Sequence, residues 1–575
     1  MIKLLRFLKP YKVPVAAVLL FLFFQSLAEL YLPTLMSDIV DTGIVKGDIQ
    51  YILRVGILML LVATVSGICM VLTSFLSAKT ATGFGRDLRS RVFAQVEDYS
   101  LNEFDKIGTA SLITRTTNDI TQVQQVVIMI LRMMVSAPLM AIGGVVMAVS
   151  KDAKLSLVLG VVIPILAGSI YLIARKGIPL FKAMQVKLDK LNLVLRENLT
   201  GVRVIRAFNR IDHEKTRFNE ANRDLTGTAI RVNKILALMM PVMMLVMNFT
   251  TIAIVWFGGI RIDQGDIQVG DMMAFLQYAM QIMFSLVMVS FMFVMIPRAE
   301  ASAVRINEVL DTVPEIRDAA EVKTADGKRG FVEFKDVTFS YPGAEKPVVN
   351  NISFDARPGE VTAIIGGTGS GKSTLVNLIL RFYDVDSGSI LVNGVDIREM
   401  SQESLRAKIG YVPQTSVLFT GTIGDNIRYG KRDATDEEIE HAVQIAQATE
   451  FVSGMKEGFD SVISQGGANI SGGQKQRLSM ARALVRRPEI YVFDDSFSAL
   501  DFKTDAKLRS ALKKETLDST VIIIAQRVST VINADRIIVL DNGQITGMGR
   551  HKELLNSCKV YREIISSQLS EEELA

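Results

Sequence analysis

Residues 366 to 373 form a glycine-rich run whose residue types and spacing suit the binding of phosphate groups. The run is Gly366-Gly367-Thr368-Gly369-Ser370-Gly371-Lys372-Ser373, which fits the pattern G-x-x-x-x-G-K-[ST]. It follows the apolar segment 361–365, so a predicted strand would deliver the loop and its backbone N–H groups would surround the phosphates. Lys372 would reach the β- and γ-phosphates, and Ser373 would bind Mg²⁺. The run therefore predicts a nucleotide site.

A second apolar segment, 490–493, ends in two carboxylates, Asp494 and Asp495. Asp494 is placed to hold Mg²⁺, because an acid at the end of a neighbouring strand completes the site that the glycine-rich loop begins. The next position, where hydrolysis would favour a longer carboxylate, is Asp495. We therefore expect the site to bind a nucleotide well and to hydrolyse it poorly.

A polar run, Ser471-Gly472-Gly473-Gln474, precedes a helical pattern that is predicted to begin near Leu478. Small residues would let backbone N–H groups and the Ser471 hydroxyl approach a γ-phosphate at a helix N-terminus, where the macrodipole favours negative charge. Since the chain already has one phosphate loop, this second anion site is predicted to serve a nucleotide held by a neighbouring chain. Such an arrangement implies a head-to-tail dimer with ATP at its seams.

The elements that position these residues must belong to more than one domain. The chain has 575 residues, whereas a single hydrophobic core supports roughly 250 to 300. Its hydrophobic fraction of 49% and mean hydropathy of +0.30 are too high for an ordinary cytosolic enzyme. Most of the apolar residues lie in the first half, which points to a membrane domain there.

About six segments are apolar and long enough to cross the hydrocarbon layer, which takes roughly 20 helical residues. They are 13–35, 52–75, 133–149, 155–173, 235–257 and 272–296. The first is the least regular, because Gln25, Glu29 and Pro33 interrupt it. The links after the first, third and fifth spans are short and acidic, whereas those after the second and fourth are long and basic. The positive-inside rule therefore places both chain ends in the cytoplasm.

The two long basic links, 76–132 and 174–234, carry apolar residues at helical spacing, so they are predicted to continue the membrane helices into the cytoplasm. From residue 331 onward, predicted strands at 332–339, 361–365, 489–493 and 521–524 alternate with helical patterns. This alternation is typical of an α/β domain with a largely parallel sheet. We expect a membrane domain at 1–314, a linker at 315–330 and a nucleotide-binding domain at 331–575.

The net charge of +4 is compatible with nucleic acid or with an anionic membrane surface. The membrane is favoured and no nucleic acid partner is expected, because the basic residues flank the apolar runs. Only two cysteines are present, Cys69 and Cys558, so a disulfide framework or a zinc site is excluded.

Taken with these motifs, the second half resembles the nucleotide-binding domain of an ABC transporter, and the whole chain resembles a bacterial ABC exporter half of the multidrug type. The fold implied is an α-helical membrane domain of about six long transmembrane helices extending into the cytoplasm, fused to an α/β P-loop ABC domain. The resemblance also implies a multi-pass protein of the bacterial cell membrane that uses ATP and Mg²⁺, with its termini and ABC domain in the cytoplasm.

The resemblance assigns roles to further residues. Tyr341 would stack on adenine, and Thr374 would extend the phosphate cradle. Gln414 would bridge Mg²⁺ to the contacts with the membrane domain. Residues 498–501, which end in Asp501, would form the loop that communicates across the dimer, and Ser471 to Gln474 would be the signature motif.

Two positions depart from the family pattern. Asp495 replaces the catalytic glutamate and is one methylene shorter, so its carboxylate should lie too far back to orient the attacking water. Gln526 replaces the expected histidine and cannot carry a positive charge beside the γ-phosphate. Together they resemble the degenerate half of a heterodimeric exporter, whose partner half would carry the glutamate and the histidine. The alternative is neutral drift in a working homodimer.

Two segments, 108–119 and 195–210, lie near the far ends of the cytoplasmic extensions. In ABC exporters similar segments are coupling helices that dock on nucleotide-binding domains, which makes Arg115, Asp119, Arg203 and Arg206 candidate contacts. The alternative is a solvated helix face, because long amphipathic helices often carry such charges.

The expected cargo is a small amphipathic or cationic drug-like molecule. Many of the 26 methionines lie in the last two spans, where flexible side chains suit a surface that repacks around dissimilar molecules, although they equally suit ordinary helix packing. Glu29 could attract cations if it faces a wet interior. The alternatives for the whole protein are a homodimeric lipid or peptide exporter and a non-pumping, ATP-gated regulatory subunit.

Overall fold

The computed structural model describes residues 1–319, 321–323, 327 and 329–568, and leaves the side chains of residues 290–294 undescribed. Two compact units are present: Met1–Glu97 with Thr109–Thr312, and Asp98–Gly108 with Val313–Ala575. The boundary expected at residue 314 places 98–108 in the first domain, whereas the structure groups this short segment with the second unit. Residues 320, 324–326 and 328 of the expected linker lie outside the described residues.

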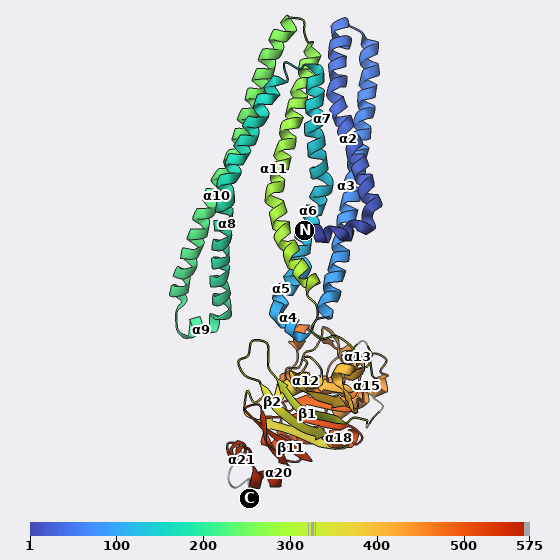
Figure 1. Ribbon diagram of the computed structural model, residues 1–575, viewed down its shortest axis with the longest axis vertical. Helices are drawn as coiled ribbons and strands as arrows, with labels where there is room; N and C mark the ends of the chain where they lie inside the picture. Colours follow the sequence, from blue (N-terminus) through green and yellow to red (C-terminus); the bar gives the residue numbers. More distant parts are fainter. Residues whose placement is uncertain (320, 324–326, 328, 569–575) are drawn as a thin grey trace. The chain divides into compact units, whose positions relative to one another are not determined.

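The first unit is built from long helices (Figure 1). Its elements are α1 (Ile2–Leu5), η1 (Arg6–Tyr11), α2 (Lys12–Asp38), η2 (Ile39–Ile44), α3 (Ile49–Glu97), α5 (Thr109–Thr114), η3 (Arg115–Asp119), α6 (Ile120–Met129), η4 (Ile130–Met134), α7 (Val135–Lys151), α8 (Leu157–Thr200), α9 (Val202–Ala207), α10 (Ile211–Asp263) and α11 (Val269–Asp311). Over the described residues, six stretches of helix are long and apolar enough to cross a membrane, which confirms the six predicted spans.

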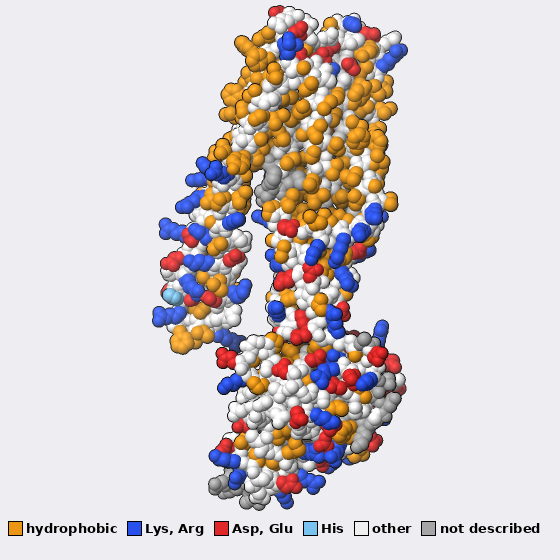
Figure 2. Space-filling model, in the orientation of Figure 1, with side chains coloured by type: hydrophobic (Ala, Val, Ile, Leu, Met, Phe, Trp, Pro, Cys, Tyr) orange, Lys and Arg blue, Asp and Glu red, His pale blue; other side chains and the backbone are white. Residues whose placement is uncertain are grey.

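The surface of the first unit is suited to lipid. In the view of Figure 2, apolar side chains cover the spanning parts of the helices, and charged side chains gather beyond them on the lower parts of α8 and α10. Leu60, Leu157 and Met240 are each more than 70% exposed, an exposure that water would penalise and hydrocarbon would not. The predicted cytoplasmic extensions are present, since α3, α8 and α10 run on without a break from apolar into charged sequence.

Helices α2, α7 and α11 approach one another closely because small residues line their contacts. A side-chain carbon added to Gly143 would lie 2.3 Å from Leu30, and one added to Gly144 would lie 2.7 Å from Ile282. Close approach over small residues increases dispersion contact, which is the main source of helix association in lipid. The position of α11 beside α2 brings the polar residues of these two spans together.

The acids of the short links tie the helix ends together. The Asp41 carboxylate accepts a hydrogen bond from the Gly270 N–H at 2.6 Å, and the Lys151 ammonium pairs with Asp271 at 2.8 Å. Asp152, the residue after Lys151, pairs at 2.6 Å with Arg261 near the end of α10. The acidic links therefore have a structural use within the unit in addition to their bearing on membrane orientation.

The first predicted coupling segment behaves differently from expectation. Asp119 is 3% exposed and bonds to Ser302 and Arg305 of α11, and Arg115 pairs with Glu308 at 2.7 Å. These two charges therefore serve helix packing inside the first unit, and the sequence prediction chose the wrong residues there. In the second segment Arg203 is exposed on the short helix α9, as is Arg206, and their docking role stays a prediction.

The second unit contains two larger sheets and a two-stranded one. Its strands are β1 (Val332–Phe339), β2 (Val349–Ala356), β3 (Val361–Gly366), β4 (Ser387–Val392), β5 (Val395–Asp396), β6 (Ile409–Val412), β7 (Gly421–Thr422), β8 (Val462–Ile463), β9 (Ile490–Asp494), β10 (Thr520–Ile524), β11 (Arg536–Asp541) and β12 (Gln544–Gly549). One sheet has the order β2-β1-β4-β5 and is antiparallel. The other has the order β12-β11-β3-β10-β9-β6 and is parallel except at the β12 edge.

The helices of the second unit are short. They are α4 (Leu101–Ile107), α12 (Lys372–Ile379), η5 (Ile397–Glu399), α13 (Gln402–Ala407), α14 (Ile423–Arg428), α15 (Asp436–Ile445), α16 (Thr449–Ser453), η6 (Gly458–Asp460), η7 (Gln465–Gly467), α17 (Gly472–Leu484), α18 (Phe502–Glu515), α19 (Val528–Val531), α20 (His551–Ser557) and α21 (Lys559–Ser566). In the six-stranded sheet, strands β3, β9 and β10 are buried on both faces: in β10, Val521 and Ile523 join one apolar core and Ile522 and Ile524 join the other. Such strands read as continuous apolar runs, which is why the strands predicted at 361–365, 489–493 and 521–524 lie within one residue of those observed. The fourth predicted strand, 332–339, coincides with β1 of the antiparallel sheet, where buried and more exposed residues alternate.

Candidate nucleotide site

Four neighbouring parallel strands end at one edge of the six-stranded sheet, and each delivers a predicted site residue there. Strand β3 leads into the glycine-rich loop, β9 ends at Asp494, β10 is followed by Gln526 and β6 by Gln414. In α/β sheets ligands bind beyond the carboxyl ends of the strands, because loops from several strands meet there. The topology therefore gathers residues that are up to 160 positions apart in sequence.

The glycine-rich loop has a backbone that side chains would obstruct. Gly369 and Gly371 have φ values of 81° and 96°, a region that L-residues rarely adopt. The Lys372 ammonium lies within the loop, where it donates to the carbonyl oxygens of Gly366 at 2.9 Å and Gly367 at 2.6 Å. Burial lowers the pKa of Lys372, although the nearby carboxylates Asp494 and Asp495 oppose this shift. A cation and free backbone N–H groups at the start of α12 fit an anionic phosphate chain.

Ser373 and Asp494 offer the oxygen ligands that Mg²⁺ prefers. The Ser373 hydroxyl lies 3.4 Å from the Asp494 carboxylate, so one ion could contact both groups. Among the described residues there is no cluster of three or more acidic, histidine or cysteine side chains that would hold a metal alone. This fits a cation bound through one carboxylate and one hydroxyl together with substrate phosphates, which is the usual mode for Mg²⁺.

Asp495 lies beside Asp494 in an unusual backbone conformation. Its φ is 45°, in the left-handed region, and its carboxylate accepts hydrogen bonds from the Gln526 backbone N–H and, at 3.4 Å, from the Gln414 amide. Burial raises the pKa of both Asp494 and Asp495, because a buried carboxylate loses hydration. The Gln526 side chain itself is exposed. The structure thus brings Asp495, Gln526 and Gln414 together. The catalytic roles expected for Asp495 and Gln526 and the Mg²⁺ role expected for Gln414 stay predictions.

Tyr341 follows β1 and lies beside the phosphate loop. Its hydroxyl is 3.2 Å from the Thr374 hydroxyl, and its ring meets Tyr383 edge to face at 5.3 Å. The ring is half-buried, so one part of it stays available for stacking. Its position next to Thr374 places an aromatic side chain beside the residue that follows the phosphate loop. Its base-stacking role stays a prediction.

Tyr383 links this aromatic pair to α4, a connection that sequence reasoning missed. The Tyr383 hydroxyl donates to Asp105 at 3.5 Å, and burial raises the pKa of Tyr383 to about 12. Glu103 of α4 accepts from the backbone N–H of Glu315 at 3.1 Å, and Asn102 donates to the Glu315 carboxylate at 2.7 Å. These bonds explain why 98–108 folds with the second unit. A pair of acids so far upstream of the ABC motifs gives no sequence signal of this contact.

The signature residues begin α17, and the helix starts earlier than predicted. The expected start near Leu478 is wrong: the helix begins at Gly472, because Ser471 and Gln474 form a capping box in which each side chain bonds to the other's backbone. A capping box supplies two hydrogen-bond partners at a helix start, so the polar run belongs to the helix. The corrected start places the free N–H groups of α17 directly at the signature.

Gly473 and Asp501 connect the signature to the loop that follows the acidic pair. A side-chain carbon on Gly473 would lie 3.2 Å from the Ala499 carbonyl oxygen, so the two segments touch. Asp501 caps α18 by accepting from the Thr504 N–H at 2.9 Å, and this bond lowers its pKa. The Ser498 hydroxyl donates to the carbonyl oxygen of Asp495 at 2.9 Å. The signature, the 498–501 loop and the acidic pair therefore form one continuous structure.

Gln568 is a second residue that the sequence did not reveal. Its amide donates to the Gln526 carbonyl oxygen at 2.8 Å and accepts from the Val528 N–H at 2.9 Å. Both bonds fix the backbone of the loop after β10, which carries Gln526. The contact spans 42 residues, and no motif surrounds Gln568 that would have indicated it.

Comparisons with known proteins agree with this geometry. A family model described as the ABC transporter transmembrane region matches residues 15–286, and one described as ABC transporter matches 349–498. An uncharacterized ABC transporter ATP-binding protein of Mycobacterium tuberculosis is 45% identical over 98% of this chain and 97% of its own. An ATP-dependent lipid A-core flippase of Desulfotalea psychrophila is 32% identical over 97% of both chains. The solved structure of a bacterial Atm1-family ABC exporter with ATP bound covers 97% of this chain and 98% of its own, with a TM-score of 0.81 and 26% identity.

Proposed function

The chain belongs to the ABC transporter family, as an exporter half-transporter, and on that premise we propose that it is the degenerate-site subunit of a heterodimeric exporter. Members of this class couple ATP, bound with Mg²⁺, to transport, and they work as dimers in a lipid bilayer with a cytoplasmic ABC domain. The proposal concerns which of the two ATP seams hydrolyses ATP and which class of molecule is transported.

The observation that carries the proposal is the pairing of Asp495 with Gln526 in an otherwise complete site. A positioned carboxylate that orients water contributes about 10²- to 10⁴-fold to hydrolysis. At this position the carboxylate is one methylene short, and hydrogen bonds from Gln526 N–H and Gln414 hold it back against the protein. The amide of Gln526 stays neutral at every pH and cannot stabilise charge on the γ-phosphate.

Nucleotide binding does not depend on Asp495 or Gln526, the two residues that depart from the family pattern. The loop N–H groups and Lys372 would hold the phosphates, and the aromatic face of Tyr341 would hold the base. Ser373 and Asp494 would hold Mg²⁺, which when bound neutralises charge on the phosphates. The cradle of this subunit would therefore keep ATP for many turnovers of the other seam, and the retained nucleotide would hold the two ABC domains close together.

The intact signature supports a contribution to the partner's seam. Ser471 caps α17 and stays exposed, so its hydroxyl and the first N–H groups of the helix are available to a γ-phosphate from another chain. The Asp501 loop packs on Gly473, which fixes the signature's position. With a glutamate and a histidine supplied by the partner, this subunit would complete a working site that it does not itself contain.

The experiment that tests the proposal compares ATP hydrolysis by the purified chain alone and in complex with a half-transporter that carries glutamate and histidine at the matching positions. We expect the chain alone to be at least about 100-fold slower, the lower limit of what a positioned base contributes. Brisk hydrolysis by the chain alone would contradict the proposal. It would favour a homodimeric exporter instead, for which the similarity to a lipid A-core flippase is the supporting observation.

For the cargo we propose an amphipathic cation, on account of Glu29. This carboxylate lies within the span of α2, half-buried, and accepts from the Gln25 amide at 2.9 Å. The Gln281 amide of α11 reaches the Glu29 carbonyl oxygen at 3.4 Å, while its own oxygen is buried without a hydrogen-bond partner among the described residues. An acid and an unmet acceptor within hydrocarbon favour a ligand that brings positive N–H groups.

The variant Glu29→Gln keeps the size and the hydrogen-bonding capacity of the side chain but removes its charge. We expect stimulation of the complex's ATPase by a cationic dye to fall about tenfold in apparent affinity, because an ion pair in low dielectric is lost. A neutral dye of similar size serves as the control and should be unaffected. Equal loss for both dyes would show that Glu29 acts through helix packing and would contradict the cation role.

A further inference from the structure

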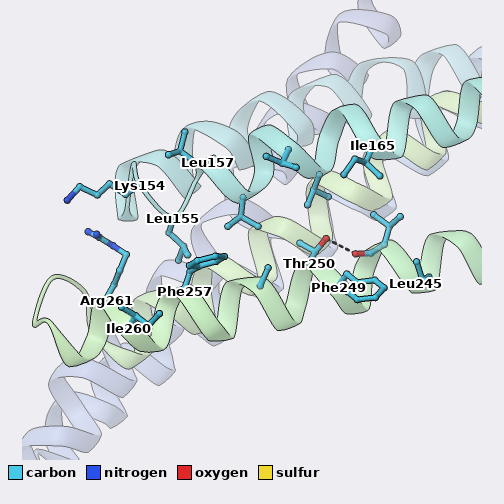
Figure 3. Close-up of a pocket in the computed structure, with 15 residues that line it drawn as sticks. Lys154, Leu155, Leu157, Ile165, Leu245, Phe249, Thr250, Phe257, Ile260 and Arg261 are labelled. Atoms are coloured by element: carbon cyan, nitrogen blue, oxygen red, sulfur yellow. Dashed lines mark hydrogen bonds between the residues drawn. The ribbon is translucent and has the colours of Figure 1, made fainter.

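An apolar groove of about 790 Å³ lies between α8 and α10 and is open in the single chain (Figure 3). Phe249 and Phe257 in its lining are each more than half exposed. ABC exporters work as dimers, so helices of a second subunit can cover such a surface, and its exposure in one chain identifies no ligand. Hydrogen bonds formed wholly within the second unit do not depend on that partner, and one group of them lies beside the nucleotide site.

Gln568 holds the loop after β10 with both ends of its amide. The amide nitrogen donates to the Gln526 carbonyl oxygen at 2.8 Å, and the amide oxygen accepts from the Val528 N–H at 2.9 Å. Val528 is the first residue of α19, so its N–H has no partner within that short helix. Among the described residues, Gln568 is the only partner that the structure gives these two backbone groups. The backbone on both sides of residue 527 therefore depends on this one side chain.

The Gln568 side chain is exposed, but the backbone that carries it is anchored. The Gln568 N–H donates to the Ile565 carbonyl oxygen at 2.9 Å, and the side chains of Ile565 and Tyr561 in α21 are at most 1% exposed. Both belong to the same apolar core as Val528 and Val531 of α19. Core packing therefore fixes the end of α21 relative to the loop, and the amide loses little conformational entropy when it bonds.

Two further contacts fix the ends of the same loop. The Gln526 N–H donates to the Asp495 carboxylate, and the Ser529 carbonyl oxygen accepts from the Arg509 guanidinium of α18 at 2.7 Å. These bonds leave the Gln526 carbonyl and the Val528 N–H, which lie between them, to Gln568. The loop is therefore held along its whole length, although the residue at position 526 is a neutral amide.

We propose that Gln568 is a positioning residue, which holds position 526 within contact distance of the γ-phosphate of a nucleotide in this chain's own phosphate loop. The inference rests on the proposed function, because it takes position 526 as the one that faces the γ-phosphate. It adds that the weak seam keeps the backbone arrangement of an active seam and differs from it in the chemistry of the side chains at 495 and 526. A charged side chain at position 526 would then act on the γ-phosphate without any other change.

The test places a titratable group at position 526 of the full-length chain by the change Gln526→His. A neighbouring phosphate raises the pKa of an imidazole from its ordinary value of about 6.5. The gain in nucleotide affinity is then fully present below the ordinary pKa and is lost as the pH rises through the raised pKa. Displacement of a fluorescent ADP derivative measures the affinity for the β,γ-imido analogue of ATP, with Mg²⁺, at pH 6 and pH 8. ADP, which has no γ-phosphate, reports on folding and on the rest of the site.

We expect Gln526→His to bind the analogue about tenfold more tightly at pH 6 than at pH 8, after correction for the parent chain, because an adjacent anion raises a pKa by about one to two units. Adding Gln568→Ala should reduce this ratio to about twofold, because loss of a helix cap shifts an equilibrium about fivefold. The affinity for ADP should stay the same. The matched control is Ser567→Ala, which removes a hydroxyl that donates to the Ile564 carbonyl oxygen at 2.7 Å, and it should leave the tenfold ratio unchanged.

A tenfold pH effect that survives Gln568→Ala would overturn the proposal. So would the absence of any pH effect in Gln526→His, because position 526 would then not reach the γ-phosphate. A fall in ADP affinity with Gln568→Ala would show a general structural role and would also overturn it. The analogue is not hydrolysed, so the outcome does not depend on which seam is active. Brisk ATP hydrolysis by the parent chain would contradict the proposed function and would leave this binding test unaffected.

Discussion

Replacing Gly473 with alanine will lower the ATPase rate of the proposed heterodimer by at least about 100-fold, although Gly473 lies outside this subunit's own phosphate loop. The new methyl group would lie 3.2 Å from the Ala499 carbonyl oxygen, closer than most such contacts, and backbone cannot move aside as a flexible side chain can. The start of α17 would shift away from the 498–501 loop. A displacement of about 1 Å at a catalytic group is enough for a loss of that size. Steady-state hydrolysis by the purified complex measures it.

The control for this variant is Lys372→Ala in the same subunit. It removes the cation of the subunit's own phosphate loop, so ATP should bind more weakly at the degenerate seam. Most of the ATPase rate of the complex should remain. The two variants separate the proposed seams, because under the proposal Gly473 would act on the partner's nucleotide and Lys372 on this chain's own. If Lys372→Ala stops hydrolysis as completely as Gly473→Ala does, the two ATP seams do not differ in activity. That result would contradict the proposal of a degenerate seam.

The second large predicted effect is an increase in the ATPase rate. Changing Asp495→Glu and Gln526→His together should raise hydrolysis by the chain alone at least about 100-fold, because a positioned base contributes about 10²- to 10⁴-fold. Asp495→Glu alone should give only part of this gain. Residue 526 would still carry no charge, and a glutamate tolerates the φ of 45° less readily than an aspartate does. Initial rates of phosphate release with saturating Mg²⁺ and ATP measure each variant.

A suitable negative control is the pair Asp495→Asn with Gln526→His. Asparagine keeps the short side chain and accepts the left-handed backbone, but it has no carboxylate. The ATPase rate of this variant should therefore stay as low as that of the parent chain. Full activity from the single change Asp495→Glu would show that Gln526 is not limiting. No gain from the double change would show that the defect lies outside these two positions.

The sequence predicted the ATP-binding domain correctly because the elements around the glycine-rich loop are encoded locally. The glycine-rich loop needs glycine where φ is positive, and the fully buried strands that flank it read as unbroken apolar runs. Hydropathy alone likewise located the six spans, since lipid requires long apolar helices. The helix that follows Ser471 was placed six residues too late because its start depends on a capping box within the motif itself.

What the sequence did not predict depends on contacts between distant segments. Asp119 seemed free to dock on another domain until the structure placed it against Arg305, 186 residues away. Tyr383 acts through one long-range hydrogen bond, to Asp105, and Gln568 through two, to the Gln526 carbonyl oxygen and from the Val528 N–H. No pattern of spacing records such pairs. Such pairs are visible only once the fold is known, whereas a phosphate loop can be recognised from its sequence alone.

The grouping of 98–108 with the ABC unit bears on how this protein can be dissected. A fragment cloned from residue 315 would express the whole sheet and every ATP motif, yet it would lack α4, which packs on it in the intact chain. Tyr383 would lose its acceptor Asp105, and the Glu315 backbone would lose Glu103. Kinetics recorded on such a fragment would describe an ABC domain without α4, whose Asp105 bonds to Tyr383 next to Tyr341. Grafting α4 back through a short flexible tether is the simplest way to recover the native surface.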